Sequence, residues 1–216
     1  MKICAAHYSS SKASAELVFA SYFDSYFKKQ KQLSIGSARA GNVIGGGDFK
    51  KDRIVPDVIK SLKRKKNIIL RNPNATRPWQ HVLEPLSGYL NLAKNLSQEN
   101  HLHGEPFNFG PPAHQNHTVY ELVVKMSEHW DQVRLNDISD AREQPYESGF
   151  LKLNCDKALQ LLNWNSVLNF SETIRMTGEW YQVFYSQESP SVSETTSRQI
   201  EEYTHLATQS NLVWTQ

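Results

Sequence analysis

The chain has 216 residues, of which 39% are hydrophobic and 11% aromatic, and its formal net charge is +2. This length and apolar content are enough to bury a substantial core, which excludes an intrinsically disordered chain. The small charge argues against a nucleic-acid partner, and two cysteines are too few for a disulfide framework.

No stretch of the sequence reaches the roughly 18 apolar residues that a membrane span requires. The apolar run after Met1 and Lys2 is also shorter than the roughly 7–15-residue core of a signal peptide. We therefore expect no membrane association and a location in the reducing cytoplasm.

Helical and strand periodicities alternate along the chain, which predicts an α/β fold. In the first half the order is a helix over about 9–29, a strand over 33–41, a glycine-rich loop, a helix over 55–65, a strand over 67–71 and a loop through Trp79. The second half continues with a helix over 84–98, a strand over 106–110, a helix over 119–130, a segment over 150–164 and a helix over 171–185. Residues 186–198 are rich in serine and threonine, which predicts a mobile linker before a last short helix near 199–208.

The first predicted helix opens with a tyrosine and a lysine four residues apart, Tyr8 and Lys12. This spacing places both residues on one face of the helix. An ammonium held beside a phenol stabilises the phenolate, which a general acid or base working near neutral pH requires. The same spacing is typical of a solvent-exposed packing pair, so the spacing alone leaves both interpretations open.

The segment GNVIGGGD, residues 41–48, follows a predicted strand at its carboxyl end, where ligands bind in open α/β sheets. Glycines let backbone amides approach a ligand closely, and the side-chain amide of Asn42 can bind a sugar or diphosphate oxygen. The alternative is a flexible connection between a strand and a helix.

Two arginines stand in segments suited to phosphate recognition, Arg53 in DRIVPD and Arg77 in NATRPW. Arg53 opens a predicted helix in which Val55 and Pro56 form an apolar wall for a base. The planar guanidinium of Arg77 suits bidentate contact with a diphosphate. Taken alone, each arginine can equally be a solvated loop residue.

Other chemically suggestive residues have ordinary structural explanations. The histidines in HLHGE and HQNH lack the Cys/His spacing of zinc sites, so we expect no metal site. The basic run KSLKRKKN ends a predicted helix, where cations complement the carbonyl-rich terminus. Cys155 lies in a helical pattern beside Ala158 and Leu159, which predicts a packed thiol rather than a nucleophile.

Four segments in chain order carry a resemblance to a known family: YSSSKASAEL, SARAGNVIGGGDFKKDRIVPDVI, LRNPNATRPWQHVLEPLSGYL and LKLNCDKALQLLNW. From Tyr8 to about Tyr185 the chain resembles the CDP-glucose 4,6-dehydratases of the extended short-chain dehydrogenase/reductase superfamily. The resemblance implies the C-terminal part of a Rossmann-type α/β fold with its smaller substrate-binding domain. Residues 1–48 would then be a remnant of the dinucleotide-binding domain, 49–185 mainly the nucleotide-sugar-binding domain with an interleaved Rossmann strand and helix, and 186–216 the linker and last helix.

The resemblance also implies roles for individual residues. Tyr8 and Lys12 would be catalytic and would contact NAD, with Tyr8 taking the proton of the C4 hydroxyl of the sugar. The substrate-binding residues would be Asn42, Arg53, Val55, Pro56, Arg77, Asn108 and Glu147, with Arg77 at the diphosphate. The chain departs from the family around Glu147, where Tyr-Glu-Ser stands in place of the usual His-Glu-Ala.

The implied activity is the NAD-dependent dehydration of CDP-D-glucose to CDP-4-keto-6-deoxyglucose, a precursor of deoxysugars in surface polysaccharides such as lipopolysaccharide O-antigen. The chain contains no G-x-G-x-x-G or G-x-x-G-x-x-G motif, although such enzymes place an NAD-binding turn about 150 residues before the Tyr-x-x-x-Lys helix. We therefore expect a C-terminal portion that needs the N-terminal half, as a partner or in a longer chain, and whose first helix promotes a homodimer or aggregation. The alternatives are a non-catalytic remnant, a sugar-nucleotide-binding module, or another NAD-dependent nucleotide-sugar epimerase or dehydratase.

Overall fold

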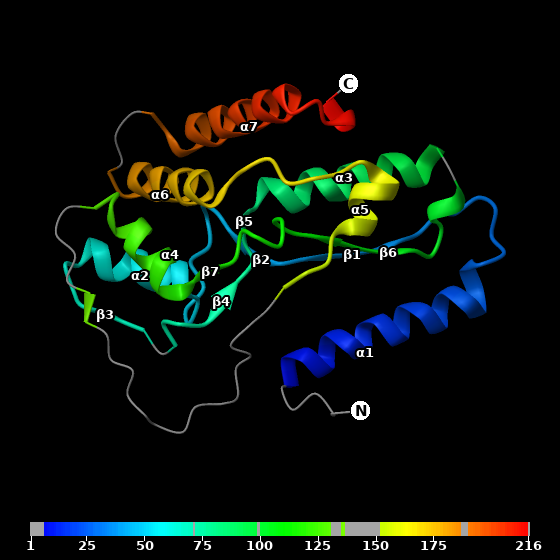
Figure 1. Ribbon diagram of the computed structural model, residues 1–216, viewed down its shortest axis with the longest axis horizontal. Helices are drawn as coiled ribbons and strands as arrows, with labels where there is room; N and C mark the ends of the chain where they lie inside the picture. The colour runs from blue at the N-terminus through cyan, green and yellow to red at the C-terminus, as the bar shows by residue number, and fades with distance from the viewer. Residues whose placement is uncertain are drawn as a thin grey trace.

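The computed structural model describes residues 7–70, 72–98, 100–130, 135–136, 152–186 and 190–215. Helices and short strands alternate along these residues, and three of the four strand pairs among them are parallel. Parallel pairing needs crossover connections, which helices usually supply. The fold is therefore α/β, as the sequence predicts (Figure 1).

The helices are α1 (His7–Tyr22), α2 (Ile54–Lys63), α3 (Leu83–Gln98), α4 (Val119–Ser127), α5 (Asp156–Leu162), α6 (Phe170–Ser186) and α7 (Val192–Gln209), with a π-helical continuation of α1, η1 (Phe23–Phe27), and two 3₁₀ turns, η2 (Asn100–Leu102) and η3 (Val213–Thr215). The strands are β1 (Ser37–Ala40), β2 (Asn42–Ile44), β3 (Ile68–Ile69), β4 (Thr76–Arg77), β5 (Trp79–His81), β6 (Pro106–Phe109), β7 (His117–Thr118) and β8 (Leu135–Asn136). None of the described helices combines the length and apolar character needed to cross a lipid bilayer.

The longer predicted helices are confirmed as α1 with η1, α2, α3, α4 and α6. The strands differ more from the prediction, because β1 covers only 37–40 of the predicted 33–41. The predicted glycine-rich loop begins as β2, and the predicted loop through Trp79 contains β4 and β5. Strand β2 pairs with β5 and β4 with β7, and such distant pairings leave no local periodicity to recognise.

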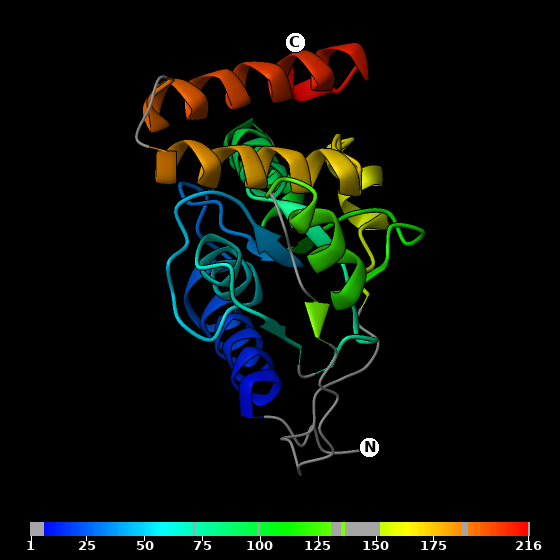
Figure 2. The same cartoon turned by 90° about the vertical axis from the view of Figure 1, so that its left-hand side faces the viewer.

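The C-terminal segment also corrects the prediction. Helix α7 begins at Val192, so the expected linker over 186–198 is wrong for the residues from 192 onward, and the last helix starts well before 199. Ser191 is the N-cap: its hydroxyl accepts the N–H of Glu194, and the Glu194 carboxylate accepts the N–H of Ser191. This capping box satisfies two terminal N–H groups and stabilises the start of a helix that serine- and threonine-rich composition concealed. Helix α7 packs on α6 as an outer layer (Figure 2).

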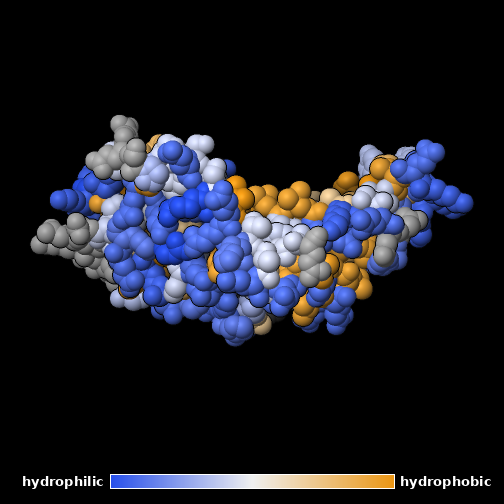
Figure 3. All heavy atoms as spheres, turned by 90° about the horizontal axis from the view of Figure 1, so that it is seen from above, coloured by the Kyte–Doolittle hydropathy of each residue, from blue (hydrophilic) through white to orange (hydrophobic). Residues whose placement is uncertain are grey.

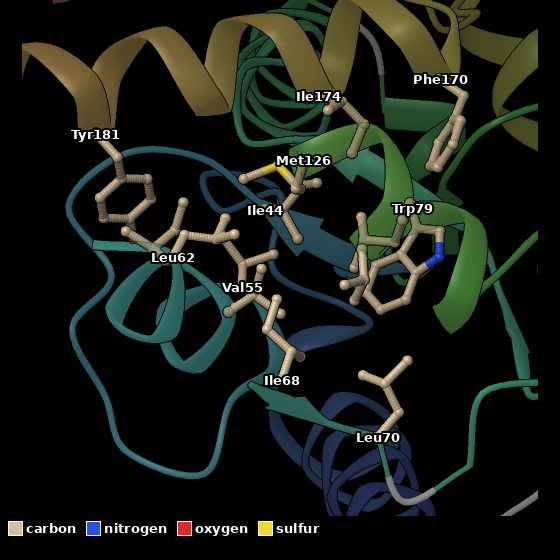
Figure 4. Close-up of a cluster of buried hydrophobic side chains, with 14 residues drawn as sticks. Ile44, Val55, Leu62, Ile68, Leu70, Trp79, Met126, Phe170, Ile174 and Tyr181 are labelled. Atoms are coloured by element: carbon tan, nitrogen blue, oxygen red, sulfur yellow. The ribbon is translucent and has the colours of Figure 1, made fainter. Parts of the chain in front are cut away.

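The largest buried cluster joins α2, α4 and α6 to the short strands around β2 and β5 (Figure 4). Ile59, Leu122 and Met126 are fully buried in it, and Ile44 and Trp79 contribute from the strands. Burying a large apolar side chain stabilises a fold by roughly 1.5–3 kcal/mol. This cluster therefore fixes α2 against β2 and β5.

A second buried cluster joins α3, β6 and α5. Helix α3 lies close to β6 because Gly88 has no side chain: an added Cβ would lie 2.2 Å from the Phe109 ring. That ring is held edge-on by Tyr89 and Trp164, with centroid distances of 5.5 and 4.9 Å. The contact fixes α3 against the β1–β6 pair.

A buried polar network ties α7 to α3. The Glu84 carboxylate, 1% exposed, accepts the backbone N–H groups of Val167 (2.8 Å) and Leu168 (2.6 Å) and the hydroxyl of Tyr203 (3.0 Å). Burial raises the pKa of Glu84 to about 7 despite these donors. The hydroxyl of Ser87 lies 2.8 Å from that of Tyr203 and completes the connection between the two helices.

Helix α1 lies on the opposite side of the molecule from α7 (Figure 2). Leu17 of α1 is 72% exposed, and Tyr26 of the continuation η1 is 64% exposed. Glu16 pairs with Arg39 at 2.9 Å and connects the helix to β1. Seen from above, hydrophobic surface gathers in the half of the molecule that holds α3 (Figure 3). Leu90 of α3 is 73% exposed. The structure therefore has the exposed apolar helix face expected from the sequence, whereas the dimer stays a prediction.

Candidate functional site

A pocket of about 1000 Å³ opens between the segment from Gly41 to Asp48 and the first turn of α2. Its described lining comprises 41–46, 48, 52–57, 72, 79, 82 and 119. Small-molecule and cofactor sites typically have volumes of roughly 300–1,000 Å³, so this pocket can hold a ligand of nucleotide size. Four predicted substrate-binding residues line it together, namely Asn42, Arg53, Val55 and Pro56.

The floor of the pocket is built where two parallel strands run side by side. Strand β2 places Asn42 opposite Trp79 of β5. The backbone N–H of Asn42 donates to the carbonyl of Pro78 at 3.2 Å, which fixes the strand on which the Asn42 side chain stands. The indole N–H of Trp79 donates to the carbonyl of His117 at 3.1 Å, so this ring is held in place before any ligand binds.

The glycine run after β2 has a packing role in addition to the ligand role that the sequence predicts. An added Cβ at Gly46 would lie 2.0 Å from the indole ring of Trp180, so α6 can approach this turn only because residue 46 is glycine. Sequence reasoning assigned these glycines to ligand approach and did not foresee the contact with α6.

Arg53 is held at the start of α2 by an acidic neighbour. It is the N-cap residue of α2, and its Nη1 atom lies 2.9 Å from Oδ2 of Asp48. Burial acts to raise the pKa of Asp48, but the N–H of Lys50 and the guanidinium of Arg53 outweigh it and hold that pKa below its usual value. Asp48 is therefore ionised at neutral pH and orients Arg53. A guanidinium has five donors, so Arg53 can contact a diphosphate while it keeps Asp48.

The first turn of α2 supplies the apolar wall that the sequence predicts. Val55 is 3% exposed, Pro56 is buried, and both line the pocket beside Ile54. Figure 4 shows Val55 and Trp79 within the same cluster of side chains. Aliphatic and aromatic surfaces of this kind are typical of sites that hold a planar ring.

Two other predicted substrate-binding residues, Arg77 and Asn108, are not brought to this pocket. Arg77 is 5% exposed on β4, its Nη1 atom donates to the carbonyl of Thr76 at 2.8 Å, and it is not among the residues that line the pocket. Asn108 stands on β6, and its amide donates to the carbonyl of Asn154 at 2.9 Å. Glu147 lies outside the described residues. The roles of these three residues stay predictions.

Tyr8 and Lys12 lie four residues apart at the start of α1, as the sequence predicts. Among the described residues, α1 contributes none that lines the pocket. The described side chains of α1 thus make no contribution to the pocket, and the catalytic role of Tyr8 and Lys12 stays a prediction.

Sequence reasoning missed further lining residues: Asp48, Asp52, Asp57, Asn72, Trp79, Val82 and Val119. Asp57 directly follows Val55 and Pro56 in the DRIVPD segment. It could have been predicted by including the next residue of the same helix turn among the candidates. Asn72, Trp79 and Val119 reach the pocket only through distant strand pairing and packing, and no local signal marks them.

The described residues contain no group of three side chains able to hold a metal ion. Two of the histidines have structural contacts instead: His103 accepts the N–H of Ile35 at 3.2 Å, and His117 stacks on Phe170 with centroids 3.9 Å apart. Cys155 is a half-buried free thiol, and burial raises its pKa, which disfavours the reactive thiolate.

Comparison with known sequences identifies a relative that spans nearly the whole chain. No protein-family model matches. A CDP-glucose 4,6-dehydratase from Salmonella typhimurium (strain LT2) is 38% identical over 208 residues, which cover 93% of this chain and 56% of that protein. The resemblance carried by the four sequence segments is therefore confirmed.

Comparison with solved structures gives the same fold. The dTDP-glucose 4,6-dehydratase of Bacillus anthracis, in complex with NAD, matches 82% of this chain with a TM-score of 0.62 and 20% identity. The UDP-glucuronic acid 4-epimerase of Bacillus cereus, in complex with UDP-glucuronic acid and NAD, matches 86% with a TM-score of 0.69 and 17% identity. The match covers 52% and 55% of those chains. The fold is that of the Rossmann-type nucleotide-sugar dehydratases and epimerases, and the chain spans about half the length of these relatives.

Proposed function

We propose that this chain carries the nucleotide-sugar-binding part of a CDP-glucose 4,6-dehydratase. The observation that carries the proposal is the pocket of about 1000 Å³ that the segments GNVIGGGD and DRIVPD build together. The 38% identity to a CDP-glucose 4,6-dehydratase supports the choice of nucleotide sugar. The whole enzyme would convert CDP-D-glucose to CDP-4-keto-6-deoxyglucose.

In this proposal each pocket residue contacts a different part of the substrate. Arg53 binds the diphosphate, because a guanidinium at the first turn of a helix faces the same anion as the free N–H groups there. Val55 and Pro56 pack against the base, and Asn42 donates its amide to a sugar or phosphate oxygen. Tyr8, assisted by Lys12, takes the proton of the C4 hydroxyl once the sugar is brought to α1. Arg77, Asn108 and Glu147 are retained as further substrate contacts of the whole enzyme.

The described residues do not fit NAD by themselves. A dinucleotide pyrophosphate binds where a glycine-rich turn leads directly from a strand into a helix. Here the glycines after β2 pack against Trp180, and α2 begins only at Ile54. We therefore propose that the NAD pyrophosphate site belongs to the other part of such an enzyme, supplied in a longer chain or by a partner, and that the assembled protein works in the cytoplasm.

Calorimetric titration of the purified chain with CDP-glucose tests the proposal, with UDP-glucose and NAD as parallel ligands. Saturable binding of CDP-glucose without NAD is the expected result, because the pocket is built from this chain alone. Absence of binding to all three ligands would contradict the proposal. It would favour the alternative that the chain is a non-catalytic remnant.

A pair of arginine variants shows whether binding occurs in this pocket. Arg53→Gln removes the proposed diphosphate contact, and we expect affinity for CDP-glucose to fall by at least about tenfold, as is usual when a charge-assisted hydrogen bond is lost. Arg64→Gln removes the same charge at the other end of α2, where residue 64 is the C-cap and lines no part of the pocket, and should leave affinity unchanged. Equal effects of the two substitutions would point to general electrostatics instead of a diphosphate site.

The exposed apolar face of α1 supports a proposal about partners. Side chains such as Leu17 and Tyr26, 72% and 64% exposed, favour burial against another surface. We propose that the chain forms a homodimer or binds the N-terminal half of the enzyme through this face. Sedimentation of the chain as a single monomeric species would contradict the homodimer.

A further inference from the structure

Two acidic side chains of the pocket have no partner among the residues that the structure describes. Three aspartates line the pocket, and Asp48 is paired with Arg53. The carboxylates of Asp52 and Asp57, by contrast, make no hydrogen bond or ion pair with any other described residue. Carboxylates repel a diphosphate, so their presence in a diphosphate-binding pocket needs an explanation. A ligand group that donates hydrogen bonds to at least one of them would supply it.

The positions of the two aspartates distinguish them. Asp52 is exposed and sits in a turn with φ of 65°, before the helix begins. Asp57 is half-buried in the first turn of α2, directly after Pro56, and its backbone N–H donates to the carbonyl of Arg53 at 3.0 Å. Asp57 is therefore the carboxylate held on a rigid element beside the apolar wall.

The chemistry of pyrimidine bases gives this carboxylate a specific use. Cytosine carries an amino group at C4, which donates hydrogen bonds, whereas uracil and thymine carry a carbonyl oxygen there, which accepts them. An ionised carboxylate only accepts. A carboxylate at the edge of the base therefore attracts cytosine and repels uracil and thymine.

From this geometry we infer that Asp57 selects cytosine by accepting a hydrogen bond from the C4 amino group of the base. The inference rests on the proposed nucleotide-sugar function and adds the residue that determines the base. The N-cap and first turn of α2 then supply all the proposed contacts at this end of the ligand: Arg53 for the diphosphate, Val55 and Pro56 for the face of the base, and Asp57 for its edge.

A structural role for Asp57 makes a different prediction. A carboxylate in the first turn of a helix also stabilises the positive end of the helix dipole. Loss of that role would lower the stability of the fold and weaken all nucleotides alike. Only base recognition changes the ratio of affinities for two nucleotides that differ at C4.

The test is competition between CDP and UDP, measured calorimetrically on the whole chain. The unsubstituted protein should bind CDP at least about tenfold more tightly than UDP, as expected for one good base contact. Asp57→Asn offers both an acceptor and a donor, so it should weaken CDP, strengthen UDP and reduce the ratio to near unity. Asp52→Asn removes the same charge from the same pocket and should leave the ratio unchanged.

The outcomes separate this inference from the proposed function. If the unsubstituted protein binds CDP and UDP equally, or if Asp57→Asn keeps the original ratio, the inference is overturned while nucleotide binding stands. If neither nucleotide binds, both the proposed function and the inference are overturned. Asp57→Glu covers the case in which the asparagine variant does not fold: it keeps the acceptor and should keep the preference for CDP, and a reversed preference would overturn the inference.

Discussion

The Glu84 network gives a prediction about how stability depends on pH. Glu84 has a folded pKa of about 7, above its ordinary value of 4.5, because it is buried. Its contribution to folding stability is therefore full below pH 4.5 and is lost as the pH rises through 7. The hydrogen bonds agree. The Ser87 hydroxyl donates to the backbone carbonyl of Glu84 at 2.8 Å, so an ionised Glu84 that accepts from Tyr203 leaves no hydrogen for the contact between Ser87 and Tyr203. A protonated Glu84 donates to Tyr203 instead, and Tyr203 can then donate to Ser87.

His81 acts in the opposite direction. Burial, together with the charge of Arg175, lowers its pKa to about 4 from 6.5. The contacts of the ring favour neutral imidazole. Nδ1 accepts the N–H of Leu83 at 3.4 Å, so it carries no proton of its own. Nε2 is buried without a partner among the described residues, so no acceptor there stabilises a charged ring. The contribution of His81 is full above pH 6.5 and is lost as the pH falls through 4.

The two titrations nearly cancel in the unsubstituted protein. From pH 5 to pH 7 the linkage relation gives a loss of about 2 kcal/mol from Glu84 and a gain of about 2 kcal/mol from His81. Glu84→Gln keeps an acceptor for the two backbone N–H groups but no longer titrates. The unfolding free energy of this variant should therefore rise by about 2 kcal/mol over the same range, whereas that of the unsubstituted protein should change little.

Urea denaturation at about pH 5 and about pH 7 measures this difference. His81→Asn provides the matched variant, because it removes the opposing group and its stability should fall by about 2 kcal/mol over the same interval. If Glu84→Gln shows the same pH dependence as the unsubstituted protein, Glu84 does not titrate in this range and the reasoning is refuted.

Three further predictions concern a cap, a close contact and the catalytic pair. Ser191→Ala removes half of the capping box of α7 and should lower stability by about 1 kcal/mol in denaturant titrations, while an unchanged midpoint would show that the cap is not formed. Gly88→Ala places a Cβ 2.2 Å from the immobilised Phe109 ring, so it should destabilise the fold by roughly 1–3 kcal/mol although alanine is the better helix former; a higher melting temperature would contradict this. Tyr8→Phe removes only a hydroxyl that we propose acts in the chemical step, so it should leave CDP-glucose affinity unchanged and should lower turnover roughly 10²–10⁴-fold once the N-terminal half is supplied; equal turnover would remove Tyr8 from catalysis.

Helices and their approximate ends could be predicted because their signals are local. Apolar spacing gave α2 and α3 to within a few residues, and α7 carried a Ser-x-x-Glu cap at Ser191 that composition obscured. The short strands could not be predicted in full, because β2 and β5 exist only through their pairing with each other.

The candidate site could likewise be predicted only in part. Asn42, Arg53, Val55 and Pro56 stand in two sequence segments whose chemistry is visible, and the structure brings these residues to one pocket. Trp79 joins them through the β2–β5 pairing, which no local pattern announces. The ion pair between Asp48 and Arg53 joins residues five apart, but whether they meet depends on how the turn is folded.

Hydrogen exchange on the chain with and without saturating CDP-glucose tests the central claim most directly, because it locates binding along the sequence. The account predicts slower exchange of backbone amides in 42–48 and in the first turn of α2, with no change in α7. Unchanged exchange in both pocket segments at saturating ligand would show that this pocket is not a nucleotide-sugar site.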